Sequence, residues 1–141
     1  MSDHHEIERT FTVDSRTTMP DLAGVGAVAS VGPPVVVDLE AAYLDTADLA
    51  LVRAGITLRR RSGGGDEGWH LKLPVGAGRD EVHQPLGEPE EPAPNALRDL
   101  VRAYTGGQDL GVVATISTRR TTTALLGDDG AVLAEVCDDE V

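Results

Sequence analysis

The chain has 141 residues and a mass of 14.8 kDa, the size of one ordinary domain. Asp and Glu number 24 against 12 Lys and Arg, and the formal charge of −12 argues against a nucleic acid or an anionic membrane as main partner. The single cysteine, Cys137, excludes an internal disulfide and a multi-cysteine zinc site. No stretch is apolar enough for a signal peptide or a membrane span, so we expect a cytoplasmic protein.

The N-terminal third is predicted to contain strands and short helices. Residues 4–13 alternate charged and less polar side chains, which is the periodicity of a strand. Residues 19–24 suit a short helix with a glycine stop, and the β-branched run over residues 35–46 suits a long strand. A further short helix is expected over residues 47–54, with Asp45 preferred as its N-cap.

Two pairs of strands are expected further along, each connected by a glycine-containing turn. The first pair covers residues 56–62 and 69–75, around the run Gly63 to Gly65. The second pair covers residues 112–126 and 131–141, around a Gly-Asp-Asp-Gly turn. Glycine favours both connections because it adopts the positive φ angles that tight turns require.

Between these pairs, residues 79–86 suit another strand, and a Pro-rich acidic stretch then leads into an amphipathic helix. The apolar stripe of this helix is expected to contain Leu97, Leu100, Val101 and Tyr104. About seven strands and two or three short helices indicate an α+β fold with a dominant antiparallel sheet. Phe11 and Trp69 are expected to pack in the protein.

Charged residues recur at spacing i, i+2 on six of the expected strands, which places each group on one face of its strand. The groups are Glu6 with Glu8; Arg59 with Arg61; His70 with Lys72; Arg79 with Glu81 and His83; Thr118 with Arg120; and Glu135 with Cys137 and Asp139. One interpretation is the solvated face of an ordinary antiparallel sheet. The other is the polar lumen of a closed barrel, where guanidinium groups bind a polyanion and carboxylates hold divalent cations. The mixture of charges favours the second interpretation, because metal-dependent phosphoryl transfer uses both kinds of group.

Six segments resemble, in this order and at these intervals, the CYTH domain of the triphosphate tunnel metalloenzyme superfamily. They are HEIERTF, YLDTADLALVRAGITLRRR, GWHLKLP, GRDEV, TRRTTTALL and AEVCDDEV. These segments are most similar to those of CYTH domains that precede a CHAD domain in bacterial proteins. The resemblance covers nearly the whole chain, so residues 1–141 are interpreted as one CYTH domain that is incomplete at its C-terminus.

The resemblance implies an eight-stranded antiparallel β-barrel, a tunnel flanked by short helices, that binds a triphosphate or polyphosphate. Members hydrolyse inorganic triphosphate, nucleoside triphosphates or thiamine triphosphate, and others cyclise ATP. We therefore expect an enzyme that hydrolyses triphosphate or polyphosphate substrates with the aid of a metal ion. The alternatives are a non-catalytic polyphosphate-binding module and an adenylate cyclase. The last strand of the family pattern is expected to be missing, which leaves an open seam. Either another chain, as in a homodimer, supplies the missing strand, or the edges of the barrel stay exposed. An attached CHAD domain is the expected partner in a longer protein.

The same resemblance assigns roles to individual residues. The metal ligands for Mg²⁺ or Mn²⁺ would be Glu6, Glu8, Glu135 and Asp139. The phosphate-binding residues would be Arg59, Arg61, Lys72, Arg79 and Arg120. The catalytic residues would be Glu6, Glu8, Lys72 and Glu81, with Glu81 or Asp139 orienting the attacking water.

Some residues beside the predicted site are expected outside it, and others differ from the family pattern. Arg60 and Arg119 have the opposite strand parity and are expected outside the site. Thr10 and Thr118 stand where the family pattern has lysines, which lowers the expected catalytic efficiency. His70 and His83 share the parity of the site and are interpreted as phosphate donors, as a proton shuttle or as hydrogen-bonded strand histidines.

Overall fold

The computed structural model describes residues 7–76, 78–89 and 91–141. Its strands and helices, in chain order, are β1 (Ser30–Val31), β2 (Val35–Asp45), α1 (Ala50–Arg53), β3 (Thr57–Ser62), β4 (Gly68–Val75), β5 (Gly78–Gln84), α2 (Asn95–Thr105), β6 (Gly111–Leu126) and β7 (Val132–Glu140). All pairings between the strands are antiparallel. The expected α+β class with a dominant antiparallel sheet is confirmed.

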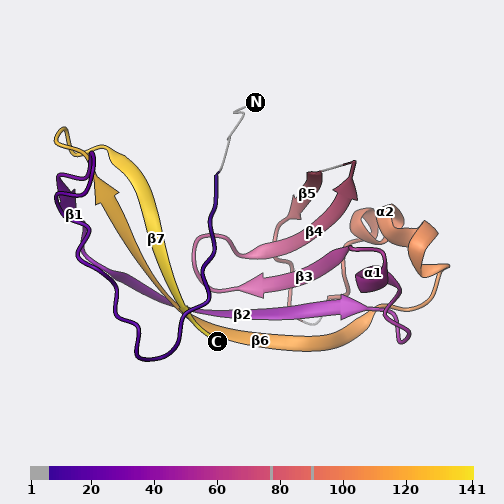
Figure 1. Cartoon of the computed structure of the whole chain (residues 1–141). Helices are drawn as coiled ribbons and strands as arrows, with labels where there is room; N and C mark the ends of the chain where they lie inside the picture. Colours follow the sequence, from indigo (N-terminus) through magenta and orange to yellow (C-terminus); the bar gives the residue numbers. More distant parts are fainter. Residues whose placement is uncertain (1–6, 77, 90) are drawn as a thin grey trace.

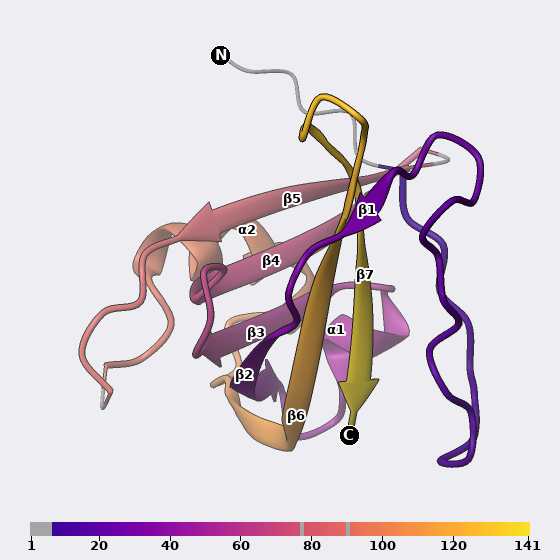
Figure 2. The ribbon, with the colours of Figure 1, turned by 90° about the vertical axis from the view of Figure 1, so that its left-hand side faces the viewer.

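The strands form one sheet in the order β1-β6-β2-β3-β4-β5, and β7 pairs with β6. Figure 1 shows this sheet bent, with the β6–β7 hairpin and the β3–β4–β5 strands rising on the same side of β2. Figure 2, the view turned by 90°, shows β4 and β5 crossing behind β6 and β7 at a large angle. Among the described residues β5 and β7 do not pair, so the expected tunnel is bent but not closed.

The hydrophobic core lies between one face of β3 and β4 and the two helices. Its buried residues are Leu51, Ile56, Leu58, Trp69, Leu71, Ala93, Leu97 and Val101. Alternation puts Leu58 and Leu71 directly opposite one another on this face, so the neighbouring charged residues of both strands face the other way. The core therefore decides which face of the sheet is left for a polar site.

Leu49, rather than Asp45 as predicted, is the N-cap residue of α1, but the Asp45 side chain still caps the first turn of this helix. Its carboxylate oxygens accept hydrogen bonds from the backbone N–H groups of Leu51, at 2.8 Å, and Val52, at 3.0 Å. The Thr46 hydroxyl oxygen accepts another from the N–H of Ala50 at 3.0 Å. These three bonds satisfy N–H groups of α1 that have no partner within the helix.

Two elements predicted near the N-terminus are wrong. Residues 7–13, the described part of the strand predicted over residues 4–13, are exposed and irregular, and Phe11 is exposed rather than packed. Residues 19–24 form no helix, because they run through turns in which Gly24 has a φ of 79°. Alternating polarity alone does not make a strand, because a strand forms only where its backbone pairs with a sheet edge, and residues 7–13 pair with none.

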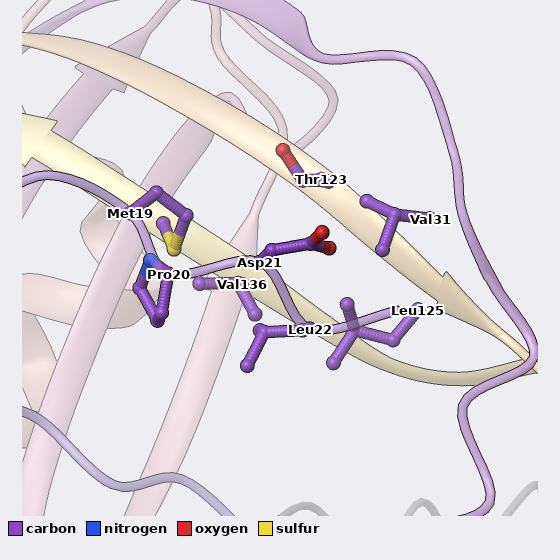
Figure 3. Close-up of a pocket in the computed structure, with 8 residues that line it drawn as sticks. All are labelled: Met19, Pro20, Asp21, Leu22, Val31, Thr123, Leu125 and Val136. Atoms are coloured by element: carbon purple, nitrogen blue, oxygen red, sulfur yellow. The ribbon is translucent and has the colours of Figure 1, made fainter. Parts of the chain in front are cut away.

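Residues 19–22 lie instead against the outer surface of β6 and β7. Figure 3 shows Met19 and Leu22 beside Leu125 and Val136, around a mostly apolar pocket of about 80 Å³. Leu125 has the parity of Arg119, so this pocket lies on the opposite face of β6 from Arg120. It is therefore separate from the charged face that the sequence singles out.

The apolar stripe of α2 is also narrower than predicted. Leu97 and Val101 are fully buried, whereas Leu100 and Tyr104 are each 48% exposed. The helix ends at Gly106, whose φ of 62° places it in the left-handed region that commonly terminates helices. Spacing at i, i+3 and i+4 defines a broad stripe, but the sheet below contacts only its centre.

Candidate functional site

Most charged residues of β3, β4 and β5 lie on the face of the sheet opposite the helices. Arg59 lies directly opposite His70, and His70 lies directly opposite His83 on the next strand. Lys72 lies opposite Glu81 in the same way. We call this surface, together with Arg61 and the corresponding residues of β6 and β7, the polar face. The strand parity predicted from the sequence is thus present in these three strands.

Arg59 and Arg61 are held on the polar face with part of each guanidinium group buried. The Nε atoms of both side chains are inaccessible to solvent and have no hydrogen-bond acceptor within the structure. The Nε of Arg60 is also buried without a hydrogen-bond acceptor, but Arg60 lies opposite Trp69 and so belongs to the face of the sheet that carries the core. Arg60 is therefore outside the polar face, as predicted.

The connection between β3 and β4 folds back over the polar face. Gly63 and Gly64 have φ angles of 88° and 72°, and a Cβ atom on Gly63 would collide with the carbonyl oxygen of Asp38. The close passage brings Asp66 to Arg61, whose Nη1 donates to Asp66 Oδ2 at 3.0 Å. Only glycine combines this backbone conformation with this close approach.

Glu81 accepts contacts from two neighbours on β4. Its Oε1 is 2.9 Å from Nδ1 of His70, and its Oε2 is 3.7 Å from Nζ of Lys72. Partial burial would raise the pKa of Glu81, but the His70 hydrogen bond and the charges of Lys72, His70 and Arg59 outweigh that effect and lower it. Glu81 is therefore ionised at neutral pH.

The second half of the polar face is organised by Arg120 and Asp139, which lie opposite one another on β6 and β7. Nε and Nη2 of Arg120 donate to the two carboxylate oxygens of Asp139, both at 2.7 Å. This bidentate hydrogen bond lowers the pKa of Asp139 and raises the pKa of Arg120. Both groups are therefore charged at neutral pH.

Two longer-range charge effects connect parts of the polar face. The charge of Arg61 also lowers the pKa of Asp139, although β2 and β6 separate their strands. The charge of Glu8 contributes to the raised pKa of Arg120, so the N-terminal segment passes near β6 at this point. Both effects fit a sheet that is bent around the polar face (Figure 1).

The remaining predicted residues differ in how closely they join this group. Arg79 is exposed on β5, two residues before Glu81, and Glu135 is exposed on β7 opposite Ala124. The Thr10 hydroxyl donates to Glu8 at 3.4 Å, and Thr118 is half-buried on the strand face that carries Arg120. Glu6 lies outside the described residues. The ligand and phosphate-binding roles of all these residues stay predictions.

One group of potential metal ligands forms in the described part of the chain, and it differs from the predicted set. The ligand atoms of Asp66, His70 and His83 all lie within 4.8 Å of one another. The described predicted ligands Glu8, Glu135 and Asp139 do not join this group. Sequence reasoning missed Asp66, which lies in a loop with no strand periodicity; its position four residues before His70 and after three glycines is the available signal.

Comparison with known proteins identifies the family. The CYTH domain model matches residues 4–141. The chain is 44% identical over 139 residues to two proteins of Mycobacterium tuberculosis, "Uncharacterized protein MT2285" of strain CDC 1551 / Oshkosh and "Uncharacterized protein Rv2226" of strain ATCC 25618 / H37Rv. Each match includes 98% of this chain but only 27% of the relative, so the chain spans about a quarter of these proteins.

Among the described residues no helix has the length and apolar character needed to span a membrane. The CYTH match places the chain in the triphosphate tunnel metalloenzyme superfamily, whose members generally depend on a metal ion and act on triphosphates. The open antiparallel sheet, with its arginines and carboxylates on the face opposite the helices, is consistent with this match. The chain belongs to the CYTH family.

Proposed function

We propose that this chain binds the phosphate chain of an inorganic triphosphate or polyphosphate on the polar face and hydrolyses it with the aid of Mg²⁺ or Mn²⁺. Membership of the CYTH family implies a triphosphate-type ligand. The cations that would receive this ligand come from four different strands: Arg59 and Arg61 from β3, Lys72 from β4, Arg79 from β5 and Arg120 from β6.

The observation that carries the proposal is the unpartnered Nε of Arg59 and of Arg61. A buried N–H group without an acceptor costs about 1–3 kcal/mol, so native proteins rarely keep one without a reason. The oxygens of a phosphate chain are strong acceptors, and guanidinium groups bind them through several N–H donors at once. A phosphate ligand would therefore satisfy donors that the protein itself leaves unsatisfied.

The carboxylates predicted as metal ligands would supply the second half of the site. Glu6, Glu8, Glu135 and Asp139 provide the oxygen donors that Mg²⁺ and Mn²⁺ prefer. Such an ion would neutralise phosphate charge and increase the acidity of a water molecule. Each oxygen of Asp139 accepts one bond from Arg120 and keeps a second lone pair that would bind the ion. Ionised Glu81 would orient the attacking water.

Phosphate release from inorganic triphosphate, measured with Mg²⁺ or Mn²⁺ and with chelator, tests the proposal. We expect turnover that depends on the metal and that Glu8→Gln abolishes, because the amide retains the shape but loses the charge. Glu88→Gln, in the exposed connection after β5, is the matched control and should retain turnover. Equal, metal-independent release by Glu8→Gln and the unchanged protein would refute the assignment.

A non-catalytic polyphosphate-binding module is the second candidate. Thr10 and Thr118 stand where the family pattern has lysines, and threonine cannot replace a cation electrostatically. Tight polyphosphate binding without phosphate release, with the metal present, would establish this alternative. It would also leave the phosphate-binding roles of the arginines intact.

A further inference from the structure

Three side chains converge at one end of the polar face, where β4, β5 and the β3–β4 connection meet. They are Asp66, His70 and His83, whose ligand atoms lie within 4.8 Å of one another. The rings of His70 and His83 are 4.6 Å apart, because the two residues are direct partners in the β4–β5 ladder. None of the three belongs to the set of predicted Mg²⁺ ligands, and Asp66 had no predicted role.

His70 is the fixed member of this group. Only 3% of its surface is exposed, and its Nδ1 lies 2.9 Å from a carboxylate oxygen of Glu81. A carboxylate accepts a hydrogen bond but does not donate one, so Nδ1 carries a hydrogen. This arrangement fixes the orientation of the ring and directs Nε2 toward the β3–β4 connection, as carboxylates do for metal-binding histidines.

Nε2 of His70 faces two oxygen atoms of Asp66. Nε2 lies 3.1 Å from the backbone oxygen of Asp66 and 3.7 Å from its Oδ1. Carboxylate and carbonyl oxygens both attract cations, so a metal ion bound by Nε2 would also be stabilised by the oxygens of Asp66.

The local backbone is shaped to bring His83 into the same place. A Cβ atom on Gly68 would collide with Nε2 of His83 and would lie 2.6 Å from the carbonyl oxygen of Gln84. Gly68 also has a φ of 146°, which side chains rarely allow. The close approach of the His83 ring to β4 therefore depends on glycine at this position.

We infer that Asp66, His70 and His83 bind one Zn²⁺ ion, with Glu81 as the outer partner that positions His70. Two imidazole nitrogens and one carboxylate oxygen match the three-ligand zinc sites that keep a fourth position for water or an anion. A Mg²⁺ ion would instead prefer oxygen ligands throughout. Tetrahedral ligands at normal zinc distances lie about 3.3 Å apart, so the exposed side chains of Asp66 and His83 would move toward the ion and away from Arg61 and the backbone oxygen of Glu67.

Calorimetric titration of the protein with Zn²⁺ tests this inference, in a large excess of Mg²⁺ and without any phosphate substrate. We expect one Zn²⁺ per chain. Glu81→Gln should weaken binding by about 10- to 100-fold, as is typical for loss of an outer partner, and His83→Ala should weaken it further. His83 is exposed, so its replacement leaves the core intact, and circular dichroism will verify the fold.

Two matched controls separate this site from other zinc-binding groups. The double variant His4→Ala/His5→Ala removes the remaining histidines of the chain and should bind Zn²⁺ unchanged. Asp80→Asn, on the opposite face of β5, should also bind unchanged, whereas Asp66→Asn should not. The inference is overturned if His83→Ala binds like the unchanged protein, if only the His4/His5 variant loses binding, or if no Zn²⁺ binds. These outcomes are independent of triphosphate hydrolysis.

Discussion

Replacing Arg59 and its neighbour Arg60, one at a time, tests the central feature of the polar face. Both residues are half-buried, both have an unpartnered Nε, and they lie on opposite faces of the same strand. Arg59→Ala removes a guanidinium group from the polar face, and Arg60→Ala removes the same group from the other face. The pair therefore keeps residue type, strand and net charge constant.

The expected loss of affinity follows from the hydrogen bonds that Arg59 would donate. A hydrogen bond to a charged group contributes about 1.5–3 kcal/mol, which corresponds to about a 10- to 150-fold weaker Kd for inorganic polyphosphate. The free energy of unfolding should change little for Arg59→Ala without ligand, because the variant also removes an unsatisfied donor. Arg59→Lys keeps the charge but lacks the planar guanidinium group, so its affinity for polyphosphate should lie between those of the unchanged protein and Arg59→Ala.

The assay is a binding titration with polyphosphate at several salt concentrations, alongside urea unfolding of each variant. Arg60→Ala should bind like the unchanged protein, and Arg59→Ala should reduce the salt dependence of binding, because one ionic contact is lost. Equal weakening by both substitutions would mean that general charge, rather than the polar face, attracts the ligand. Unchanged affinity in Arg59→Ala would refute the role given to its unpartnered Nε.

Three further predictions concern stability. Gly68→Ala should lower the free energy of unfolding, measured in urea, by about 1–3 kcal/mol, because the new Cβ collides with His83 and the φ angle is unfavourable for alanine. A variant as stable as the unchanged protein would contradict this prediction. Leu97→Ala should cost about 2–5 kcal/mol by the same measurement, since Leu97 is fully buried in the core, and a loss below 1 kcal/mol would mean that α2 repacks. Asp139→Asn should cost at most about 1 kcal/mol, because the Arg120 pair is partly exposed. Because pairing lowers the pKa of Asp139, the difference in free energy of unfolding between the two proteins should be complete above the pKa of the unfolded state, about 3.9. It should disappear as the pH falls through the lower pKa of the native state. A difference that grows in acid would contradict the pairing.

Local periodicity explains why the sequence predicted most strands and the orientation of their side chains. A strand places residues i and i+2 on one face whatever surrounds it, so Arg59 could be grouped with Arg61, and Arg60 excluded, before the fold was known. The same rule grouped His70 with Lys72, and the register of β4 and β5 confirms their common face. The ordered set of motifs was specific enough to identify the CYTH family, which the family match over residues 4–141 confirms.

The failures near the N-terminus and in α2 have a different cause. A strand over residues 4–13 requires a neighbouring edge, and the described residues 7–13 do not pair with one. Likewise, the burial of Leu97 but not Leu100 depends on the position of the sheet beneath α2. Pairing and coverage are properties of the assembled sheet, so the amphipathic pattern of one segment does not determine them.

By itself, the sequence determined the strand faces, the turns and the family, because each depends on short-range backbone geometry or on ordered motifs. Only the tertiary structure decided which residues meet across strands and loops. The register of β4 and β5 placed His70 beside His83, and the glycine-rich connection then brought Asp66 to both. Likewise, the bend of the sheet brought the charge of Arg61 to act on Asp139. Contacts of this kind join residues that are far apart in the sequence, so a pattern within one short segment does not predict them.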